Sequence, residues 1–443
     1  MAYASRYGRR PMENASRSSH TYVINDAAVQ GFLDQCVLPP AAERVDIPAD
    51  RIVACQPEES PIRHFVAIDG GYQVVPVRAD YPSAEVCFLQ FGALIFGAED
   101  LENLAHQPFI DPADMAKLKQ IQRFKLVLPV RNVSLSSESS FTASVRQALY
   151  RFFRDTEDPS LLDTLAWLIF RDFRHGTPPV WDLASCPECG QGTISLRKSK
   201  MSADYTFQCP ECGGTILLTD VLRLHEAIDE EMGAGGILGY VTTAVEQLIL
   251  VHVIRTILNT KPDLLRHLLF IKDGPLAFFG QTANMHKPMR ALVRYLLKKH
   301  DLFLAGLEKS GAFVEHADEI ASRLDPGTAI LLDSDYIYRY ILPRGTNAQG
   351  AYGRTTYYGA KLIHKTHSGD MHVVTLPTGK PLEQPLAADL PHLNVILDNI
   401  ERLHCDMYDN ALIPVALANK LVSLANHPSA HILEKFAKES IQS

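Results

Sequence analysis

Two short cysteine motifs constrain the fold of this 443-residue chain more than any other feature of its sequence. Cys186-Pro-Glu-Cys189 and Cys209-Pro-Glu-Cys212 are separated by 19 residues, and each motif is followed by glycine. Two residues between thiolates allow both sulfurs to reach one tetrahedral ion, and the glycines allow the backbone to turn back toward them. We therefore expect a zinc ribbon of β-hairpins at residues 181–218, in which these four cysteines bind a structural Zn²⁺. Four thiolates leave no open coordination position, so this ion has no catalytic role.

The overall composition is that of a globular protein in a reducing compartment. Hydrophobic residues make up 46% and charged residues 21% of the chain, and the net charge is −8. This charge excludes a generally basic nucleic-acid coat and leaves only a local basic groove for such contacts. Paired CxxC motifs favour metal binding over disulfides. The most apolar stretch, residues 237–258, carries Glu246, His252 and Arg255, which indicates a buried helix and not a membrane span. We find no secretory signal and expect a cytoplasmic protein.

The order of apolar patterns predicts an α/β fold with a mixed sheet flanked by helices. Residues 1–22 are predicted to be a disordered tail, with a DNA-contacting arm or a transit peptide as alternatives. The body is predicted at residues 23–180 and 219–443, on either side of the ribbon. Helices are expected at 25–35, throughout 111–174, and at 240–258, 287–299, 393–403 and 413–425. Strands are expected at 64–68, 72–77, 84–96, 268–272, 303–307, 328–332, 356–364 and 371–376.

Three acidic residues are candidates for a catalytic metal site. Asp69 and Asp273 each follow an apolar run and precede glycine, so that each is predicted to end a buried strand. Glu246 lies among apolar residues of the long helix, where an unpaired carboxylate requires a cation. Oxygen ligands of this kind are preferred by Mg²⁺ and Mn²⁺. The alternatives are ordinary Asp-Gly turns and a glutamate at the edge of the apolar face.

A basic helix follows the second aspartate. Lys287, Arg290, Arg294 and Lys298 are spaced three or four residues apart and share one helical face. This face is predicted to follow a phosphate backbone, with a solvated surface as the alternative. His364 and His367 lack the context of a zinc protease and are expected at the surface. The remaining cysteines are expected to be small buried hydrophobic residues: Cys36, Cys55, Cys87 and Cys405.

Several of these segments, taken in order, resemble the motifs of the NurA nuclease family, the partners of HerA-type translocases. Ile68-Asp69-Gly70-Gly71 is similar to the first strand motif, Glu246 to the helical glutamate, and residues 270–276 (FIKDGPL) to the second aspartate motif. Residues 304–310, which include Lys309, and residues 326–332 and 412–421 resemble the later segments. Two departures are clear. The family has a histidine after an alanine in the last helix, whereas Ala418 is followed here by Asn419, and the stretch between Asp69 and Glu246 is lengthened by the zinc ribbon, which is expected to be an insertion for docking.

The resemblance implies an RNase H-like fold, a homodimer with a DNA channel, and DNA cleavage that depends on Mn²⁺ or Mg²⁺. It implies that Asp69, Glu246 and Asp273 bind the catalytic metal, that Lys309 steadies a phosphate oxygen or a metal-bound water, and that Asn419 replaces a catalytic histidine. Asp333 and Asp335 are further candidate ligands of the catalytic metal, but the preferred interpretation is that they are acidic residues of a turn.

The function predicted on this basis is a metal-dependent DNA exonuclease or endonuclease. It would act with a HerA-type hexameric ATPase in DNA end processing or in defence against phage. Two alternatives stay open: a catalytically inactive assembly subunit of a translocase complex, which the asparagine favours, and a zinc-ribbon nucleic-acid adaptor.

Overall fold

The computed structural model describes residues 17–442 except 37–40, 42–43, 79, 99–118, 157–158, 344–349, 406–410 and 425–428. The chain divides into two units, residues 1–45 and residues 46–443. The first unit contains α1 (Arg17–Ile24) and α2 (Ala27–Leu33), and the Asp26 carboxylate accepts hydrogen bonds from the first turn of α2. Residues 1–16 of the predicted tail lie outside the described residues. The prediction is wrong for residues 17–22, which belong to α1.

The second unit is built on a sheet that has nine strands in the described part of the chain, in the order β1-β11-β12-β13-β10-β9-β2-β3-β4. Strands β2, β9 and β10 are parallel to one another, and the other neighbouring strands are antiparallel. The predicted mixed α/β sheet is thus confirmed. The strands are β1 (Ile52–Ala54), β2 (His64–Arg78), β3 (Ala84–Gly97), β4 (Lys119–Arg131), β9 (Leu268–Asp273), β10 (Phe303–Glu308), β11 (Thr328–Leu331), β12 (Gly359–Lys365) and β13 (Met371–Pro377).

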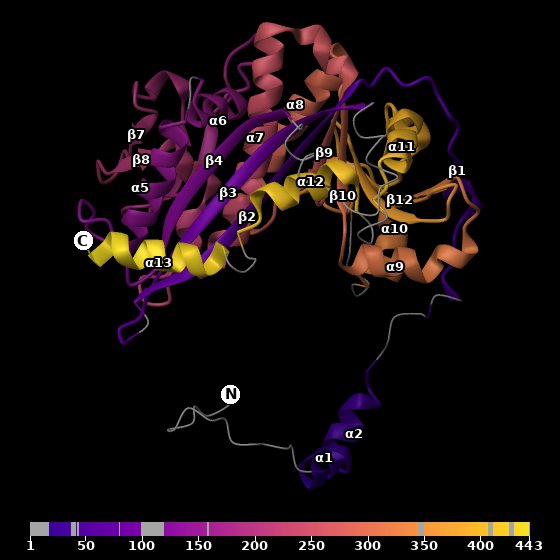
Figure 1. The fold of residues 1–443 in the computed structure, drawn as a ribbon, viewed down its shortest axis with the longest axis horizontal. Helices are drawn as coiled ribbons and strands as arrows, with labels where there is room; N and C mark the ends of the chain where they lie inside the picture. Colours follow the sequence, from indigo (N-terminus) through magenta and orange to yellow (C-terminus); the bar gives the residue numbers. More distant parts are fainter. Residues whose placement is uncertain are drawn as a thin grey trace. The chain divides into compact units, whose positions relative to one another are not determined.

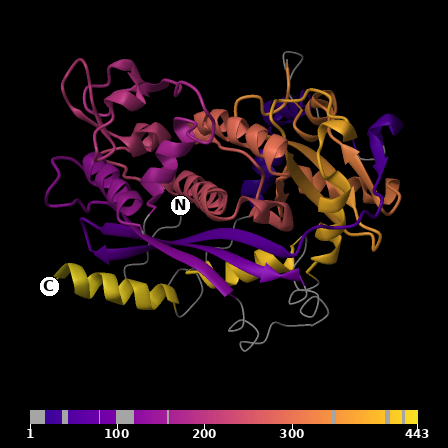
Figure 2. The same cartoon turned by 90° about the horizontal axis from the view of Figure 1, so that it is seen from above.

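Helices cover both faces of this sheet. On one face α7 (Leu238–Thr260) lies along the long strands β2 and β3, together with α5 (Phe141–Arg154), α6 (Leu161–Ile169) and α8 (His286–Lys299). On the other face, α12 (Ile413–Val422) and α13 (Ser429–Gln442) contact β2, as seen from above in Figure 2. α11 (Leu393–Arg402) packs with α12 into the hydrophobic core on this face of the sheet. α9 (Ala312–Ile320) packs against β13, and the short α10 (Ser334–Tyr336) follows β11. The arrangement is shown in Figure 1.

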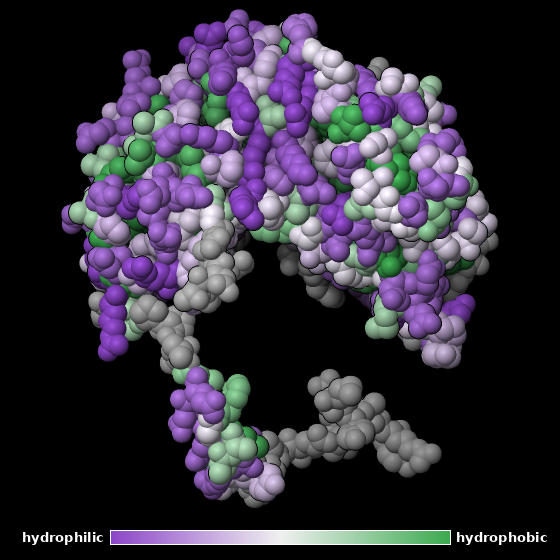
Figure 3. All heavy atoms as spheres, turned by 180° about the vertical axis from the view of Figure 1, so that it is seen from behind, coloured by the Kyte–Doolittle hydropathy of each residue, from purple (hydrophilic) through white to green (hydrophobic). Residues whose placement is uncertain are grey.

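The long apolar helix is buried, as expected. Within the described residues, Gly235–Thr260 is the one helix long and apolar enough to span a membrane, and 78% of its most apolar window is buried inside the protein. Hydrophilic residues predominate over the rear surface of the second unit, where hydrophobic residues form small separate patches (Figure 3).

Two long strands of the sheet also differ from their prediction. β4 lies in a region that was expected to be helical, but burial alternates along its residues 123–128: Phe124, Leu126 and Leu128 are buried, while Arg123 and Lys125 are exposed. This period of two is that of a strand with one face on the core. β2 continues through the Asp-Gly-Gly segment where two shorter strands were expected, because β3 pairs with it along its whole length.

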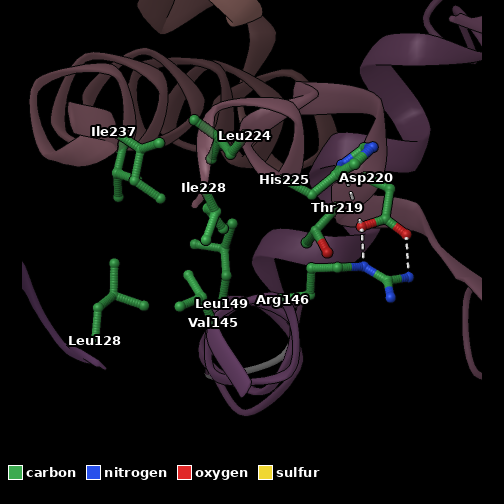
Figure 4. A pocket seen from close by; sticks show the side chains of 11 residues that line it. Leu128, Val145, Arg146, Leu149, Thr219, Asp220, Leu224, His225, Ile228 and Ile237 are labelled. Carbon is green, nitrogen blue, oxygen red and sulfur yellow. Dashed lines mark hydrogen bonds and ion pairs between the residues drawn. The ribbon is translucent and has the colours of Figure 1, made fainter. Parts of the chain in front are cut away.

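The cysteine motifs lie at the turns of two small hairpins, β5 (Trp181–Ser185) with β6 (Gly192–Leu196) and β7 (Thr206–Gln208) with β8 (Thr215–Leu217). A buried arginine of α5 attaches them to the body. Arg146 donates two hydrogen bonds to the Asp220 carboxylate, and both residues line one small pocket (Figure 4). Arg146 donates a third hydrogen bond to Glu188, within the first cysteine motif, at 2.6 Å. Because Arg146 and Asp220 are both nearly inaccessible, each needs the other's charge.

Arg146→Ala is expected to destabilise the protein by about 3 kcal/mol, because it leaves the buried Asp220 carboxylate without its cation. Chemical denaturation would measure the loss. Arg151→Ala, at an exposed position of the same helix, is the control and should change the stability by less than about 0.5 kcal/mol. Equal effects of the two variants would contradict the anchoring role.

Candidate functional site

The two candidate aspartates lie side by side on neighbouring parallel strands. Ile68 of β2 is in register with Lys272 of β9, so the next residues, Asp69 and Asp273, are at the same level of the sheet. Adjacent strands are about 4.8 Å apart. Asp273 ends β9 as predicted, but Asp69 lies in the middle of β2, which corrects the expectation that it ends a strand.

Asp69 is a buried carboxylate whose charge is only partly compensated. Its side chain is buried, Oδ1 accepts a hydrogen bond from the Gly70 amide at 2.8 Å, and Oδ2 has no partner among the described residues. Burial and, to a smaller extent, the charge of Asp273 raise the pKa of Asp69 to about 6, although Lys309, the Gly70 amide and the Asn419 side chain act to lower it. A buried carboxylate oxygen without a partner is costly and calls for a cation.

Lys309 supplies one nearby positive charge. It follows β10, the strand that pairs in parallel with β9, and its Nζ lies 2.8 Å from Asp273 Oδ2. The ion pair is partly exposed to solvent. Lys309 therefore neutralises the negative charge of Asp273 directly, while the same ammonium acts on Asp69 only at longer range, where it lowers the pKa of that carboxyl group.

α12 brings Asn419 to the same side of the sheet. The helix lies across β2 and β3, where Gln90 donates a hydrogen bond to the Leu421 carbonyl at 3.0 Å. A Cβ atom at Gly71 would be 2.7 Å from the Val422 carbonyl oxygen, so only glycine permits this close approach. The position of Asn419 is thus determined by backbone packing against β2.

Glu246 approaches the site from the α7 face. A Cβ atom at Gly70 would be 3.1 Å from Glu246 Oε1, so the glycine leaves the space that this carboxylate occupies. Glu246 is buried and forms an ion pair with Lys272 at 3.5 Å. Burial raises the pKa of Glu246 to about 8; Lys272 lowers it, and the charges of Asp69 and Asp273 raise it.

The three acidic residues therefore interact electrostatically but do not form a closed ligand cage. Side chains alternate along a strand, and Ala67 and Ile271 face the core beneath α11 and α12. Asp69 and Asp273 share that face, opposite to α7. Sequence analysis missed Lys272, the partner of Glu246, although it directly precedes Asp273 in the sequence.

The basic face of α8 is partly occupied by structural contacts. Arg290 donates hydrogen bonds to the carbonyls of Gly353 and Arg354, and Arg294 donates to the carbonyl of Gly379 at 3.1 Å. These arginines hold the loops that flank β12 and β13, a role that the helical pattern did not reveal. Lys287 and Lys298 are exposed, so a phosphate-binding role remains a prediction for them.

The four cysteines of the two hairpins converge on one point. Among the described residues they are the one group of three or more His, Cys, Asp or Glu whose ligand atoms all lie within 4.8 Å of one another. The Sγ atoms of Cys186 and Cys212 are 3.9 Å apart, and those of Cys189 and Cys209 are 4.0 Å apart. Sulfurs bound at about 2.3 Å to a tetrahedral ion are about 3.8 Å apart, so the donor set fits Zn²⁺.

The backbone around these sulfurs supports thiolates. Gly190 and Gly213 have φ values of +72° and +71°, the left-handed conformation that glycine adopts readily. The amide of Gly214 donates to Cys212 Sγ, and the backbone amide of Cys212 lowers the pKa of Cys209 to about 7. The predicted role of the glycines is confirmed.

Other candidates have structural roles or unexpected positions. Asp333 caps α10 through the Tyr336 amide and forms an ion pair with Arg51 at 3.3 Å, whereas Asp335 is exposed. Cys87 and Cys405 are buried as expected, and Cys55 is half-buried. Two predictions are wrong: Cys36 is exposed, and His364, expected at the surface, is buried.

No family model and no curated protein matches the chain. The solved structures that are similar to it include three of NurA proteins. The NurA nuclease from Sulfolobus solfataricus has 8% identity over 97% of this chain and 98% of its own, with a TM-score of 0.36. NurA with manganese has 11% identity over 88% and 91%, with a TM-score of 0.29, and a further NurA structure has 11% identity over 95% and 97%, with a TM-score of 0.31.

Asp69→Asn is expected to stabilise the metal-free protein at pH 8 and to have little effect at pH 4. The folded-state pKa of about 6 is above the ordinary value of 3.8, so the contribution of Asp69 to the stability of wild type is most favourable below about pH 4 and is lost as the pH rises through 6. Asparagine carries no charge, and the difference at pH 8 should be on the order of 2 kcal/mol.

Thermal unfolding with a chelator at the two pH values would measure this effect. Asp335→Asn, at an exposed position, is the matched control. A stabilisation by Asp69→Asn that is the same at pH 4 and pH 8 would show that ionisation of Asp69 is not its cause.

Proposed function

We propose that this protein is a DNA nuclease that depends on a divalent metal ion. The observation that carries the proposal is the Asp69 carboxylate, buried beside Asp273 with one oxygen that lacks a partner among the described residues. Two carboxylates at one level of adjacent parallel strands offer the oxygen ligands that Mg²⁺ and Mn²⁺ prefer. The meander β2–β3–β4, extended by parallel β9 and β10, supports the proposed RNase H-like fold.

The residues of the site have separate tasks in this proposal. Asp69 and Asp273 would hold the metal, whereas Glu246, paired with Lys272 on the opposite face of the sheet, would act on them through its charge. When bound there, a divalent metal would activate a water and stabilise the charge that develops on the phosphodiester. Lys309 holds Asp273 in place and is placed to attract a phosphate oxygen. Asn419 offers a carbonyl oxygen but cannot transfer a proton.

The wider setting depends on the resemblance to NurA proteins. We propose that the chain forms a homodimer in the cytoplasm and acts on DNA with a HerA-type hexameric ATPase, in end processing or defence against phage. We also propose that the cysteine cluster is a zinc ribbon with a structural Zn²⁺. The spacing of its sulfurs supports this assignment.

An inactive assembly subunit is the second candidate. Two observations favour it: the Lys272 ammonium is paired with Glu246, and Asn419 stands where the family has a histidine. A pure zinc-ribbon adaptor is not favoured by any feature of the acidic site.

Purified protein is expected to degrade linear DNA with Mn²⁺, and Asp69→Asn should reduce the rate by about 100-fold or more, because a metal ligand is lost. Gel analysis of DNA degradation would measure the rate. Asp335→Asn should retain wild-type activity. Equal degradation by wild type and Asp69→Asn would exclude this site, and the absence of activity in folded wild type would favour the inactive subunit.

A HerA-type ATPase is expected to bind the protein in a stable complex, since both the nuclease and the inactive-subunit proposals require one. Co-purification from cells that express both chains would test this, with Asp69→Asn as a variant that should bind equally well. Separate elution of the two proteins would contradict the partnership without affecting the assignment of the metal site.

A further inference from the structure

Several histidines lie close together at the turn of the β12–β13 hairpin, outside the acidic site. His364 of β12 pairs directly opposite His372 of β13, and each is 1% exposed. His404 lies just after α11, where it forms a β-bridge with Leu412. His367 lies in the hairpin turn and is largely exposed. None of these residues has a part in the proposed nuclease chemistry.

His372 is the central residue of this group. Neither of its ring nitrogens has a hydrogen-bond partner in the described part of the chain. A neutral imidazole carries one N–H and one lone pair, and leaving such groups buried and unpaired costs about 1–3 kcal/mol. Burial lowers the pKa of His372 to about 4, with the neighbouring histidines His404 and His364 acting in the same direction, so the ring is neutral at physiological pH. Neutral imidazole is the form that binds metal ions.

Two further donors stand beside His372 with suitable spacing. The ring centroids of His372 and His404 are 5.5 Å apart, and two imidazoles on one tetrahedral ion have centroids on the order of 5 Å apart. His404 Nε2 is 3.7 Å from Asp370 Oδ1, too long for a hydrogen bond but close to the roughly 3.3 Å between two ligands of one ion. The other oxygen of Asp370 accepts a hydrogen bond from Ser368 at 2.6 Å, which orients the carboxylate.

We propose that His372, His404 and Asp370 bind a divalent transition-metal ion of the Zn²⁺ class. Two imidazoles and one carboxylate are a common ligand set for such ions, with water in the fourth position. The three ligand atoms do not yet all lie within 4.8 Å of one another. His404 and Asp370 lie at the rim, 22% and 39% exposed, so these two side chains can move toward the buried His372 when the ion binds.

The neighbouring pair, His364 and Glu401, is a separate group. A carbonyl can only accept a hydrogen bond, so the contact of His364 Nδ1 with the Thr328 carbonyl at 3.2 Å places the ring N–H on that nitrogen. Glu401 contacts His367 at 3.0 Å and lies 4.0 Å from His364 Nε2. We therefore assign these residues to the surroundings of the ion and not to its ligands.

The ion would connect the hairpin to the segment that leads into α12. His404 forms a β-bridge with Leu412, and next to this bridge the Ile413 amide at the start of α12 donates a hydrogen bond to the Leu403 carbonyl. α12 carries Asn419 across β2. Binding of the ion should therefore stabilise the placement of this helix as well as the hairpin.

The experiment measures Zn²⁺ content in the full-length protein. Metal is removed with a chelator, Zn²⁺ alone is added back, unbound ion is removed by gel filtration, and the bound zinc is measured by mass spectrometry. His404→Ala and Asp370→Asn are each expected to retain one fewer Zn²⁺ per chain than wild type, or to bind it at least about 10-fold more weakly. The thermal stabilisation that wild type gains from the added Zn²⁺ should decrease in both variants.

His367→Ala is the matched control, because His367 lies in the same turn but outside the ligand set. It should bind as much Zn²⁺ as wild type, and circular dichroism of all variants would establish that each is folded. Both ligand variants lie at the rim, so neither removes a core side chain. Equal zinc content in wild type, His404→Ala and Asp370→Asn would overturn the proposal, and so would an equal loss of zinc in His367→Ala.

Discussion

The parallel pairing of β2 with β9 is the constraint on which the candidate site depends. These strands are distant in the sequence, and their register alone places Asp69 beside Asp273. The same register sends Lys272 to the opposite face, where it meets Glu246. The sheet therefore separates the acidic groups into two sets, each with a lysine at its edge. Without those lysines, three negative charges would share one poorly solvated region at a large cost in stability.

Much of the fold could be predicted from the sequence because apolar periodicity reports local burial. The long helix and the strands that end at Asp273 and Glu308 follow this rule closely. β4 was missed although its residues alternate, because helical patterns on its C-terminal side were extended across it. The uninterrupted course of β2 was missed because glycines usually end a strand, whereas here β3 pairs with the entire segment.

The site was only partly predictable, and the reason is geometric. Sequence patterns identified the acidic residues, since each lies next to apolar residues or glycine. They could not show which face of the sheet each carboxylate occupies, because that depends on strand register and on the approach of α7 at Gly70. The loop contacts of Arg290 and Arg294 were equally hidden, since basic residues on one helical face suggest phosphate as readily as carbonyl partners. The burial of His364 depends on the pairing between β12 and β13, which places it opposite His372.

Gly71 gives α12 a fixed distance from the sheet. The helix meets β2 through a main-chain carbonyl, and no side chain at position 71 separates the two backbones. A spacing set by side chains can vary as rotamers change, but a spacing set by two backbones cannot. Asn419 therefore moves with β2 as part of one rigid body, and evolution can change the chemistry at position 419 without altering how far that residue stands from Asp69.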